Sequence, residues 1–265
     1  MCLVKEHLKF LVKKSGKDST RIIGKKKYWK EYFDKRAYKF SKMQSHEVNG
    51  FVDKRLVNSL RNCVRENINK NDFNLVIDCG CGDGSVSSEL VNPNRKVIGI
   101  DISSLMCKRA SEKGLITFKL DMDKLRKKSL KDLLKSYNFE EDKKQCVVFC
   151  ESLGCIENPL KMIDGFCANN KNISNLLFSF PNKNSLIRKI INLMHENEIN
   201  YFSLKCLKEI GYKYKYNNFY LSYIVAVPFL FSFHLRIKNK KNFINLIKNK
   251  FAKLFGLNIV ILLKK

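Results

Sequence analysis

The feature that most constrains the fold of this chain is a glycine-rich segment, Asp-Cys-Gly-Cys-Gly-Asp-Gly, over residues 78–84. It follows an apolar run at 73–77 and precedes a helix-like stretch at 85–90, so we expect a strand, a tight turn and a helix. Glycines at alternate positions let the backbone pass closely beneath a ligand, where a Cβ atom would collide. This context is typical of nucleotide-binding turns.

Two carboxylates flank this turn and restrict the ligand. Asp78 and Asp83 would place two negative charges beside a bound pyrophosphate, whereas a ligand with a positive centre would be attracted. A dinucleotide fingerprint also expects glycine where this chain has Ser85. The turn therefore favours a positively charged nucleoside over a dinucleotide such as NAD.

Two further predicted strands end in carboxylates. Residues 96–101 read as the next strand and end in Asp101, which suits a bidentate hydrogen bond to the two hydroxyls of a ribose. Residues 115–120 form a third β-like run before Asp121 and Met122. This carboxylate can accept the exocyclic amine of adenine, while the methionine packs on the ring. The three signals together indicate an adenosine site at one edge of a sheet.

Residues 74–123 resemble the cofactor half of class I S-adenosylmethionine-dependent methyltransferases. In that family the loop after the first strand holds the methionine part of the cofactor, the next acid holds the ribose and the third holds the adenine. Glu151, after the fourth predicted strand, is expected to line the same pocket. The resemblance implies that S-adenosylmethionine is the cofactor. The cofactor-binding residues that we expect are Asp78, Gly80, Cys81, Gly82, Gly84, Asp101, Ile102, Asp121, Met122 and Glu151.

The resemblance covers about residues 28–225 and a last strand at 257–263. Strands that alternate with helices favour a parallel sheet covered on both faces. We expect an α/β, Rossmann-like seven-stranded methyltransferase sheet, mostly parallel with an antiparallel last strand and with helices on both faces. The other expected strands are 145–150, 172–180 and 216–227, and the expected helices include 53–66, 103–113 and 124–137.

The chain is expected to form a single methyltransferase domain over 25–265, preceded by a basic N-terminal arm at 1–24. Within the domain we expect lid helices at 25–70, a cofactor half at 71–158 and a substrate half at 159–265. A basic amphipathic helix is predicted at 236–256. Its cationic and aromatic faces suit an anionic membrane surface, or it packs on the sheet as an ordinary helix.

Catalysis depends mainly on orientation, because a sulfonium already activates its methyl group. A hydroxyl acceptor also needs a base. His195 is the candidate catalytic base, since a free imidazole titrates near about pH 6.5; otherwise it is a surface or hinge residue. Many small-molecule members carry Glu-His in the loop after the fourth strand, where this chain has Gly154 and Cys155. This departure removes one candidate base or metal ligand.

Charge and cysteine content bear on partners and compartment. The formal net charge of +26 suits nucleic acid or an anionic membrane, although an AT-rich coding sequence would also enrich lysine. The ten cysteines match no metal-binding spacing, so we expect no metal site. Without a signal peptide they indicate a reducing, cytoplasmic location, with peripheral membrane attachment if 236–256 binds lipid. No apolar run is long enough to require a spanning helix.

These features predict methyl transfer to a small-molecule or lipid-linked acceptor, at oxygen. One alternative is a nucleic-acid (RNA) methyltransferase. The loop after the fourth strand lacks the Asn/Asp-Pro-Pro-aromatic signature of base-methylating enzymes, and no RNA-binding module is appended. A second alternative is a catalytically silent cofactor-binding partner or membrane-surface scaffold. The sequence does not indicate an oligomeric state.

Overall fold

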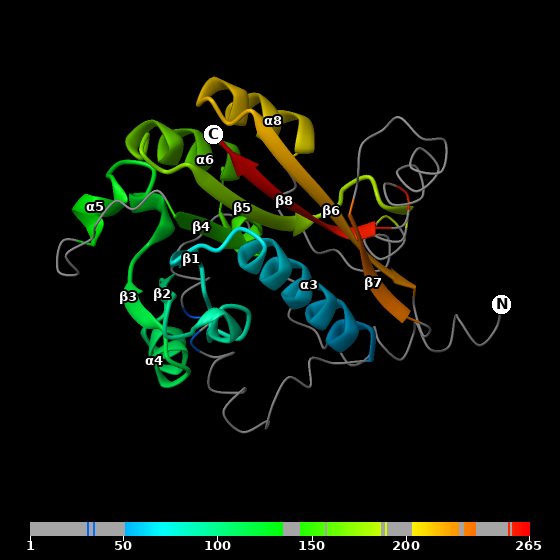
Figure 1. Ribbon diagram of the computed structural model, residues 1–265, viewed down its shortest axis with the longest axis horizontal. Helices are drawn as coiled ribbons and strands as arrows, with labels where there is room; N and C mark the ends of the chain where they lie inside the picture. The colour runs from blue at the N-terminus through cyan, green and yellow to red at the C-terminus, as the bar shows by residue number, and fades with distance from the viewer. Residues whose placement is uncertain are drawn as a thin grey trace.

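A single mixed sheet forms the centre of the molecule (Figure 1). The computed structural model describes residues 31, 34, 51–134, 144–156, 158–186, 189, 203–227, 231–236, 254 and 256–265. Within these residues the sheet contains eight strands: β1 (Leu75–Cys79), β2 (Lys96–Asp101), β3 (Ile116–Lys119), β4 (Gln145–Cys150), β5 (Asn175–Pro181), β6 (Asn218–Val227), β7 (Phe231–Arg236) and β8 (Gly256–Lys264).

The strands follow the order β3-β2-β1-β4-β5-β8-β6-β7. Strands β1 to β5 pair in parallel, and β8 is antiparallel to both β5 and β6. The predicted Rossmann-like sheet of seven strands with an antiparallel last strand is thus confirmed. Strand β7 is an addition that the sequence analysis did not predict. It folds back antiparallel on β6 and forms the edge of the sheet beyond the seven.

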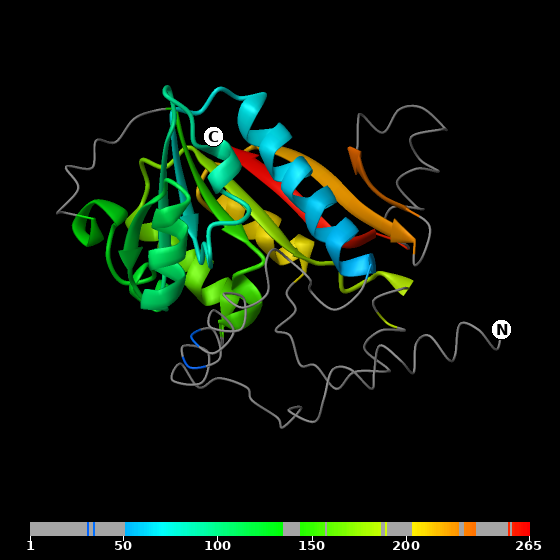
Figure 2. The ribbon, with the colours of Figure 1, turned by 90° about the horizontal axis from the view of Figure 1, so that it is seen from below.

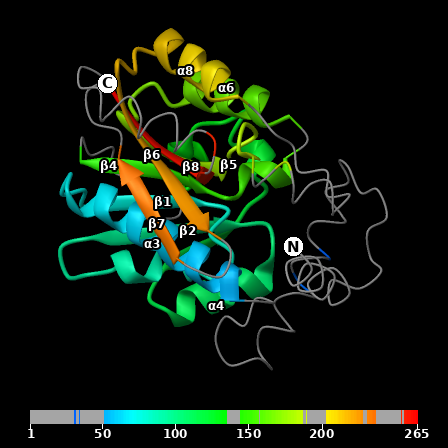
Figure 3. The same cartoon turned by 90° about the vertical axis from the view of Figure 1, so that its right-hand side faces the viewer.

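Helices cover both faces of the sheet, as predicted (Figure 3). Helices α3 and α4 pack on one face, and α5, α6 and α8 on the other. The bounds of these helices are α3 (Phe51–Asn69), α4 (Ser104–Glu112), α5 (Leu130–Leu133), α6 (Pro159–Asn169) and α8 (Leu204–Lys213). Because both faces are covered, every residue of β1 and β4 is buried, which explains why both strands are mostly apolar.

Aromatic side chains join the central strands to the α6 layer. The Phe149 ring on β4 stacks on Phe178 of β5 with centroids 5.2 Å apart, and meets Phe166 of α6 edge-on at 5.4 Å. Both arrangements are favourable for aromatic pairs. The cysteines also serve the core, since seven of the nine described cysteines are buried and all nine are free thiols. The strands whose carboxyl ends carry the candidate site are therefore packed into the core.

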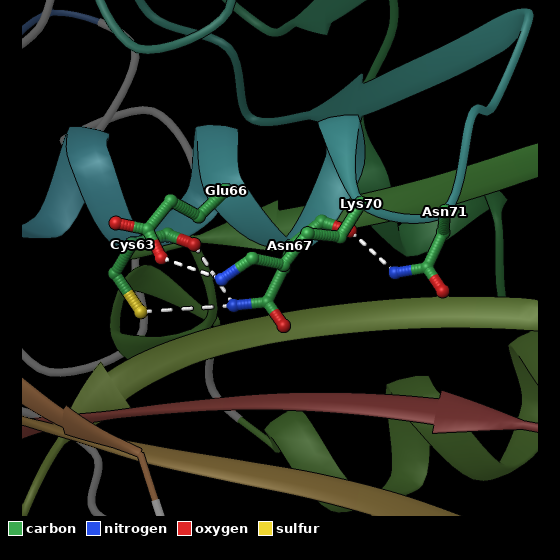
Figure 4. A network of polar contacts seen from close by, with 5 residues as sticks. All are labelled: Cys63, Glu66, Asn67, Lys70 and Asn71. Carbon is green, nitrogen blue, oxygen red and sulfur yellow. Dashed lines mark hydrogen bonds and ion pairs between the residues drawn. The ribbon is translucent and has the colours of Figure 1, made fainter.

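The C-terminal end of α3 is fastened by asparagine side chains (Figure 4). Asn67 donates through its amide nitrogen to the Cys63 carbonyl at 2.8 Å, and Asn71 donates to the Asn67 carbonyl. Lys264 at the end of β8 donates to the Asn71 side chain. Asp72 then turns the chain towards β1 with a positive φ of 50°. These contacts hold the C-terminal end of α3 next to the end of β8, while the helix itself lies across one face of the sheet (Figure 2).

Two predicted helices differ from the structure. The stretch 85–90 contains turns and a short 3-10 helix, Ser88–Leu90, because the Asp83 side chain accepts from the Ser85 amide and draws the backbone into a turn. The predicted helix at 124–137 shrinks to α5 within the described residues. Ser129 starts α5 as an N-cap, so the preceding residues remain outside it.

Other predictions are confirmed or lie outside the described residues. The helix expected at 103–113 is present as α4, and Ser103 caps it by accepting from the Met106 amide. The arm at 1–24, His195 and all of 236–256 except Arg236, Leu254 and Gly256 lie outside the described residues. Among the helices that are described, none has both the length and the apolarity needed to cross a bilayer.

Candidate active site

The glycine turn after β1 is held against the end of β2. The amides of Gly80 and Cys81 both donate to the Ile100 carbonyl, at 2.7 and 3.1 Å. Gly80, Gly82 and Gly84 have φ angles of +82°, +55° and +72°, in the left-handed region that side chains disfavour. The alternating glycines in the sequence thus correspond to alternating left-handed positions. The turn projects from the carboxyl edge of the sheet, where ligands bind in this class of fold.

Three strand-end loops converge on Gly80. A Cβ atom added there would lie 2.4 Å from the Ser152 Cβ, in the loop after β4, and 3.3 Å from the Met122 Cε, in the loop after β3. The Ser152 hydroxyl is buried and has no hydrogen-bond partner among the described residues. At Gly82, by contrast, a Cβ would meet no atom within 4 Å. Gly80 is therefore the point of closest contact, and Gly82 faces open space.

Asp101, at the end of β2, ties this turn to the start of α4. Its carboxylate accepts from the Gly82 amide through Oδ2 and from the Ser103 amide through Oδ1, both at 2.9 Å. Burial raises the pKa of Asp101, and the negative charge of Asp34 adds to this rise, while the backbone amides oppose it. Each carboxylate oxygen keeps further acceptor capacity, so the side chain can also receive hydroxyl donors.

Asp78 is the second carboxyl beside the turn, and it is only 1% exposed. Ser87 donates its hydroxyl proton to Oδ2 of this residue, whereas Oδ1 has no partner among the described residues. Burial raises the pKa of Asp78 from 3.8 to about 7; the Ser87 hydrogen bond opposes the rise and the charge of Asp101 adds to it. A buried acceptor atom without a donor indicates a site for a ligand that supplies one.

The charge of Asp83 is compensated, contrary to the expectation from the sequence. Its carboxylate forms an ion pair with Lys113 at 2.8 Å. Burial acts to raise the pKa of Asp83, but hydrogen bonds from Lys113 and Ser85 outweigh it, and the pKa is lowered. Asp78 and Asp101, also next to the turn, form no ion pair with any cation among the described residues. The anionic character of this edge thus comes from the ends of β1 and β2.

The remaining predicted cofactor residues occupy three different positions. Cys81 is buried, and its Sγ lies 2.8 Å from where a Cβ of Gly99 would be, so the thiol packs into the sheet and only its backbone faces the turn. Ile102 is half-buried beside Asp101. Asp121 is half-buried and accepts from the Asp123 amide at 2.9 Å, which caps the 3-10 helix Met122–Lys124.

Glu151 directly follows β4 and forms hydrogen bonds with β5. Its carboxylate accepts from the Ser179 hydroxyl on β5, and its amide donates to the Ser179 carbonyl at 3.1 Å. Glu151 has a φ of +53°, which is uncommon for a residue other than glycine. Strained backbone of this kind concentrates at functional sites. Ser179 therefore holds the Glu151 carboxylate beside the end of β5.

Sequence reasoning missed the roles of Ser87 and Ser152. Both lie in segments that the sequence analysis describes, but a serine in a loop does not by itself indicate a binding site. Their importance depends on contacts with Asp78 and Gly80 that only the folded chain creates.

Comparison with known proteins identifies the family. A family model described as a methyltransferase domain matches residues 70–224, which is more than half of the chain. The chain therefore belongs to the methyltransferase domain family, as the sequence of residues 74–123 predicted. A stretch of 62 residues is 40% identical to an uncharacterized methyltransferase of Schizosaccharomyces pombe. That match spans 23% of this chain and 24% of the yeast protein, about a quarter of its length.

Solved structures confirm the fold. An S-adenosylmethionine-dependent methyltransferase from Thermotoga maritima superimposes with a TM-score of 0.59 at 12% identity, over 89% of this chain and 99% of that one. Magnesium protoporphyrin IX methyltransferase from Synechocystis, solved with bound S-adenosylmethionine, gives a TM-score of 0.56 at 17% identity, over 93% and 100% of the two chains. The chain is therefore a member of the methyltransferase domain family, and it has the fold of these S-adenosylmethionine-dependent methyltransferases.

Proposed function

We propose that this protein transfers the methyl group of S-adenosylmethionine to a small-molecule or lipid-linked acceptor, and that the methylated atom is oxygen. The observation that carries the proposal is the convergence on Gly80 of loops from β1, β3 and β4, beside the buried carboxyls of Asp78 and Asp101. A glycine turn next to two carboxyls without a cation suits a nucleoside with a positive centre. It opposes a pyrophosphate, which would bring further negative charge.

The described residues fit the cofactor. Among the described residues, Oδ1 of Asp78, on β1, and the hydroxyl of Ser152, in the loop after β4 that contacts Gly80, have no hydrogen-bond partner, and an ammonium group can donate to both. The spare acceptor capacity of Asp101 suits the ribose hydroxyls, and Met122 and Asp121 lie on the loop where adenine would bind. When bound, the cofactor supplies a methyl group already activated by its sulfonium. The protein then has to orient the acceptor and exclude water.

Glu151 supports an oxygen acceptor. Its carboxylate is exposed at the carboxyl edge of β4, on the side that faces β5, and Ser179 fixes its orientation. In this position it can receive the proton of an acceptor hydroxyl, as general-base catalysis requires. Two similar structures bear the names of small-molecule methyltransferases, one for magnesium protoporphyrin IX and one for plantazolicin, which supports a small acceptor. His195 stays a predicted base.

Replacing Asp101 with alanine is expected to abolish the thermal stabilisation that S-adenosylhomocysteine gives to the wild type. Each hydrogen bond to a charged group contributes about 1.5–3 kcal/mol, so losing two ribose contacts lowers affinity by at least about a hundredfold. Differential scanning fluorimetry with a ligand series measures the effect. Asp132→Asn, in an exposed position on α5, is the control. NAD should give no shift, and an undiminished shift in Asp101→Ala would refute the ribose assignment.

Ser152→Ala is expected to change stability and binding in opposite directions. The variant keeps the Cβ that packs on Gly80 but removes a buried hydroxyl that has no partner. An unsatisfied buried polar group costs about 1–3 kcal/mol, so the ligand-free variant should unfold at higher urea concentration than the wild type. Its affinity for S-adenosylhomocysteine should fall at least about tenfold, as expected for one hydrogen bond to a charged ammonium group. Urea unfolding measures the change in stability, and calorimetry measures the change in affinity. A binding constant equal to that of the wild type would show that Ser152 does not contact the ligand.

The acceptor class can be tested by methyl transfer from labelled S-adenosylmethionine into fractionated host extract. We expect label in the small-molecule or lipid fraction, and loss of that label in Glu151→Gln. Label in the RNA fraction alone would favour a nucleic-acid methyltransferase. No label in any fraction, together with retained binding of S-adenosylhomocysteine, would favour a catalytically silent binding protein.

A further inference from the structure

Tyrosine and lysine alternate where α8 leads into β6. Residues 212–220 read Tyr-Lys-Tyr-Lys-Tyr-Asn-Asn-Phe-Tyr, and β6 begins at Asn218. The side chain of Tyr212 is 59% exposed and that of Tyr220 is 40% exposed, whereas Tyr216 is buried. Two tyrosine rings therefore lie at the surface of a segment that also carries lysines, and the candidate active site uses none of these residues.

This segment lies at the edge of the sheet opposite to the candidate active site. Asn218 is in register with Lys264 near the end of β8, and the Asn217 amide donates to the Lys264 carbonyl at 3.0 Å. Because β8 is antiparallel to β5, its end lies beside the start of that strand, where the Lys265 amide donates to the Ser174 carbonyl at 3.1 Å. Figure 1 shows this edge at the C mark, beside α8. A ligand here would be remote from the glycine turn, which follows the other end of β1.

Four lysines gather at this edge and form no ion pair among the described residues: Lys171, Lys215, Lys264 and Lys265. Lys265 donates to the Lys171 carbonyl, and its Nζ lies 5.0 Å from the centroid of the Tyr216 ring, next to Lys215 in the sequence. Three carboxylates near this edge are already paired with other lysines, as Lys70–Glu66, Lys144–Asp72 and Lys213–Asp164. The positive charge of the four lysines is therefore available to attract an anion.

The ammonium groups of Lys264 and Lys265 have fixed positions. Lys264 donates to the Asn71 side chain, and its Nζ lies 5.6 Å from the ring centroid of Tyr220 and 6.0 Å from that of Phe73. Each ammonium has three donors and uses one of them in its hydrogen bond to Asn71 or Lys171, so donors remain for an anion. Because these side chains are already ordered, binding an anion costs less conformational entropy than binding to mobile lysines would.

Lysines interleaved with exposed tyrosine rings suit a single-stranded nucleic acid. Lysines neutralise phosphates, and an exposed aromatic ring is a platform on which an unpaired base stacks. The exposed side chains of Asn217 and Asn218 add donors and acceptors for base edges. An anionic bilayer bound at this edge would hold the carboxyl edge, and with it the candidate active site, away from the membrane. The arrangement therefore favours a nucleic acid over a lipid surface.

We infer that this edge, formed by residues 212–220 together with Lys171, Lys264 and Lys265, is a binding surface for single-stranded nucleic acid. Phosphates contact the lysines, and a base stacks on Tyr220. The inference goes beyond the proposed function and is independent of it. Because the surface lies opposite to the carboxyl edge, the strand is bound there as a partner and is not methylated there.

The test measures binding of a fluorescent oligouridylate of about twelve nucleotides to the full chain by anisotropy, over a series of salt concentrations. For single strands, the logarithm of the affinity falls against the logarithm of the salt concentration by about 0.7 for each phosphate neutralised. Lys215→Ser combined with Lys265→Ser should therefore make this slope less steep by about 1.4. Tyr220→Leu should leave the slope unchanged and lower the affinity at least about fivefold, as expected for the loss of one stacked base.

Lys127→Ser combined with Lys128→Ser is the matched control, because it removes the same charge from exposed positions between β3 and α5. This control should keep the wild-type slope. A change in slope equal to that of the Lys215 and Lys265 variant would show general attraction to a basic protein and would overturn the surface. Wild-type affinity in Tyr220→Leu would overturn the stacking. If Tyr220→Leu does not fold, Tyr212→Ser removes the more exposed ring, and wild-type affinity there overturns the stacking instead.

Further probes identify the ligand. An oligouridylate and an oligothymidylate should each bind more tightly than an RNA duplex of the same length, and the tighter of the two identifies RNA or DNA as the partner. Equal affinity for the duplex would overturn the assignment to a single strand. Flotation with phosphatidylserine vesicles, without binding of either oligonucleotide, would overturn it in favour of a membrane. The Lys215 and Lys265 variant should bind S-adenosylhomocysteine as the wild type does, so failure of this inference leaves the proposed function intact.

Discussion

Gly80→Ala is expected to abolish binding of S-adenosylhomocysteine and to lower the free energy of unfolding by about 2–6 kcal/mol. Two costs add: a residue with a side chain is strained at the φ of +82°, by about 1–3 kcal/mol, and crowding in a packed site costs about 1–3 kcal/mol more. The added Cβ would lie 2.4 Å from the Ser152 Cβ, so the loop after β4 has to move away. Because that loop meets the glycine turn at the candidate site, its displacement destroys the surface that would bind the cofactor.

Gly82→Ala is the matched control for this prediction. It carries a similar backbone penalty at a φ of +55°, but its Cβ would meet no atom within 4 Å. The variant should therefore lose less stability than Gly80→Ala in urea unfolding. Equal losses would show that backbone strain alone decides the effect and that contact with Ser152 is unimportant. Gly80→Ala with wild-type affinity would contradict the position assigned to the cofactor.

The second large effect is expected at Asp78. Its pKa is raised from 3.8 to about 7, so between these values the folded chain holds a proton that the unfolded chain has released. Stability therefore falls as pH rises through this window. At about 1.4 kcal/mol for each pH unit, the wild type should lose on the order of 3 kcal/mol between about pH 5 and pH 8 through this group. Asp78→Asn removes the titration, so it should lack this loss while binding the cofactor more weakly.

Urea unfolding at both pH values, with Asp72→Asn as control, measures this difference. Asp72 lies before β1 and its side chain is 90% exposed, so its replacement should leave the pH dependence as in the wild type. The informative quantity is the change in stability between the two pH values, because the new amide nitrogen of Asp78→Asn has its own desolvation cost. Parallel pH curves for Asp78→Asn and the wild type would show that Asp78 titrates normally in the folded chain.

The fold was largely predictable because local signals agreed with one another. One short apolar run ends in Asp101 and another precedes the 78–84 turn. Such runs are typical of strands in a parallel sheet that is covered on both faces. Strand β7 was missed because Pro228 interrupts an apolar run at 219–235, and the pattern alone does not indicate that the run folds back on β6. The stretch 85–90 was misjudged as a helix, since its serines bond to Asp78 and Asp83 instead.

The site was predictable where chain direction alone positions a group. Asp101 is the last residue of its strand, and parallel strands bring their ends to one edge, so its approach to Gly82 could be expected. The ion pair of Asp83 with Lys113 could not be expected, because it depends on where the end of α4 packs. The role of Ser152 could not be predicted either, because serine is common in loops and only its packing on Gly80 distinguishes this one.

A crystal structure of the complex with S-adenosylhomocysteine tests the central claim most directly. We predict that the ribose hydroxyls lie within hydrogen-bonding distance of the Asp101 carboxylate, with the amino group of the ligand near Asp78 and Ser152. Ligand bound elsewhere, with Asp101 and Asp78 turned away from it, would contradict the account.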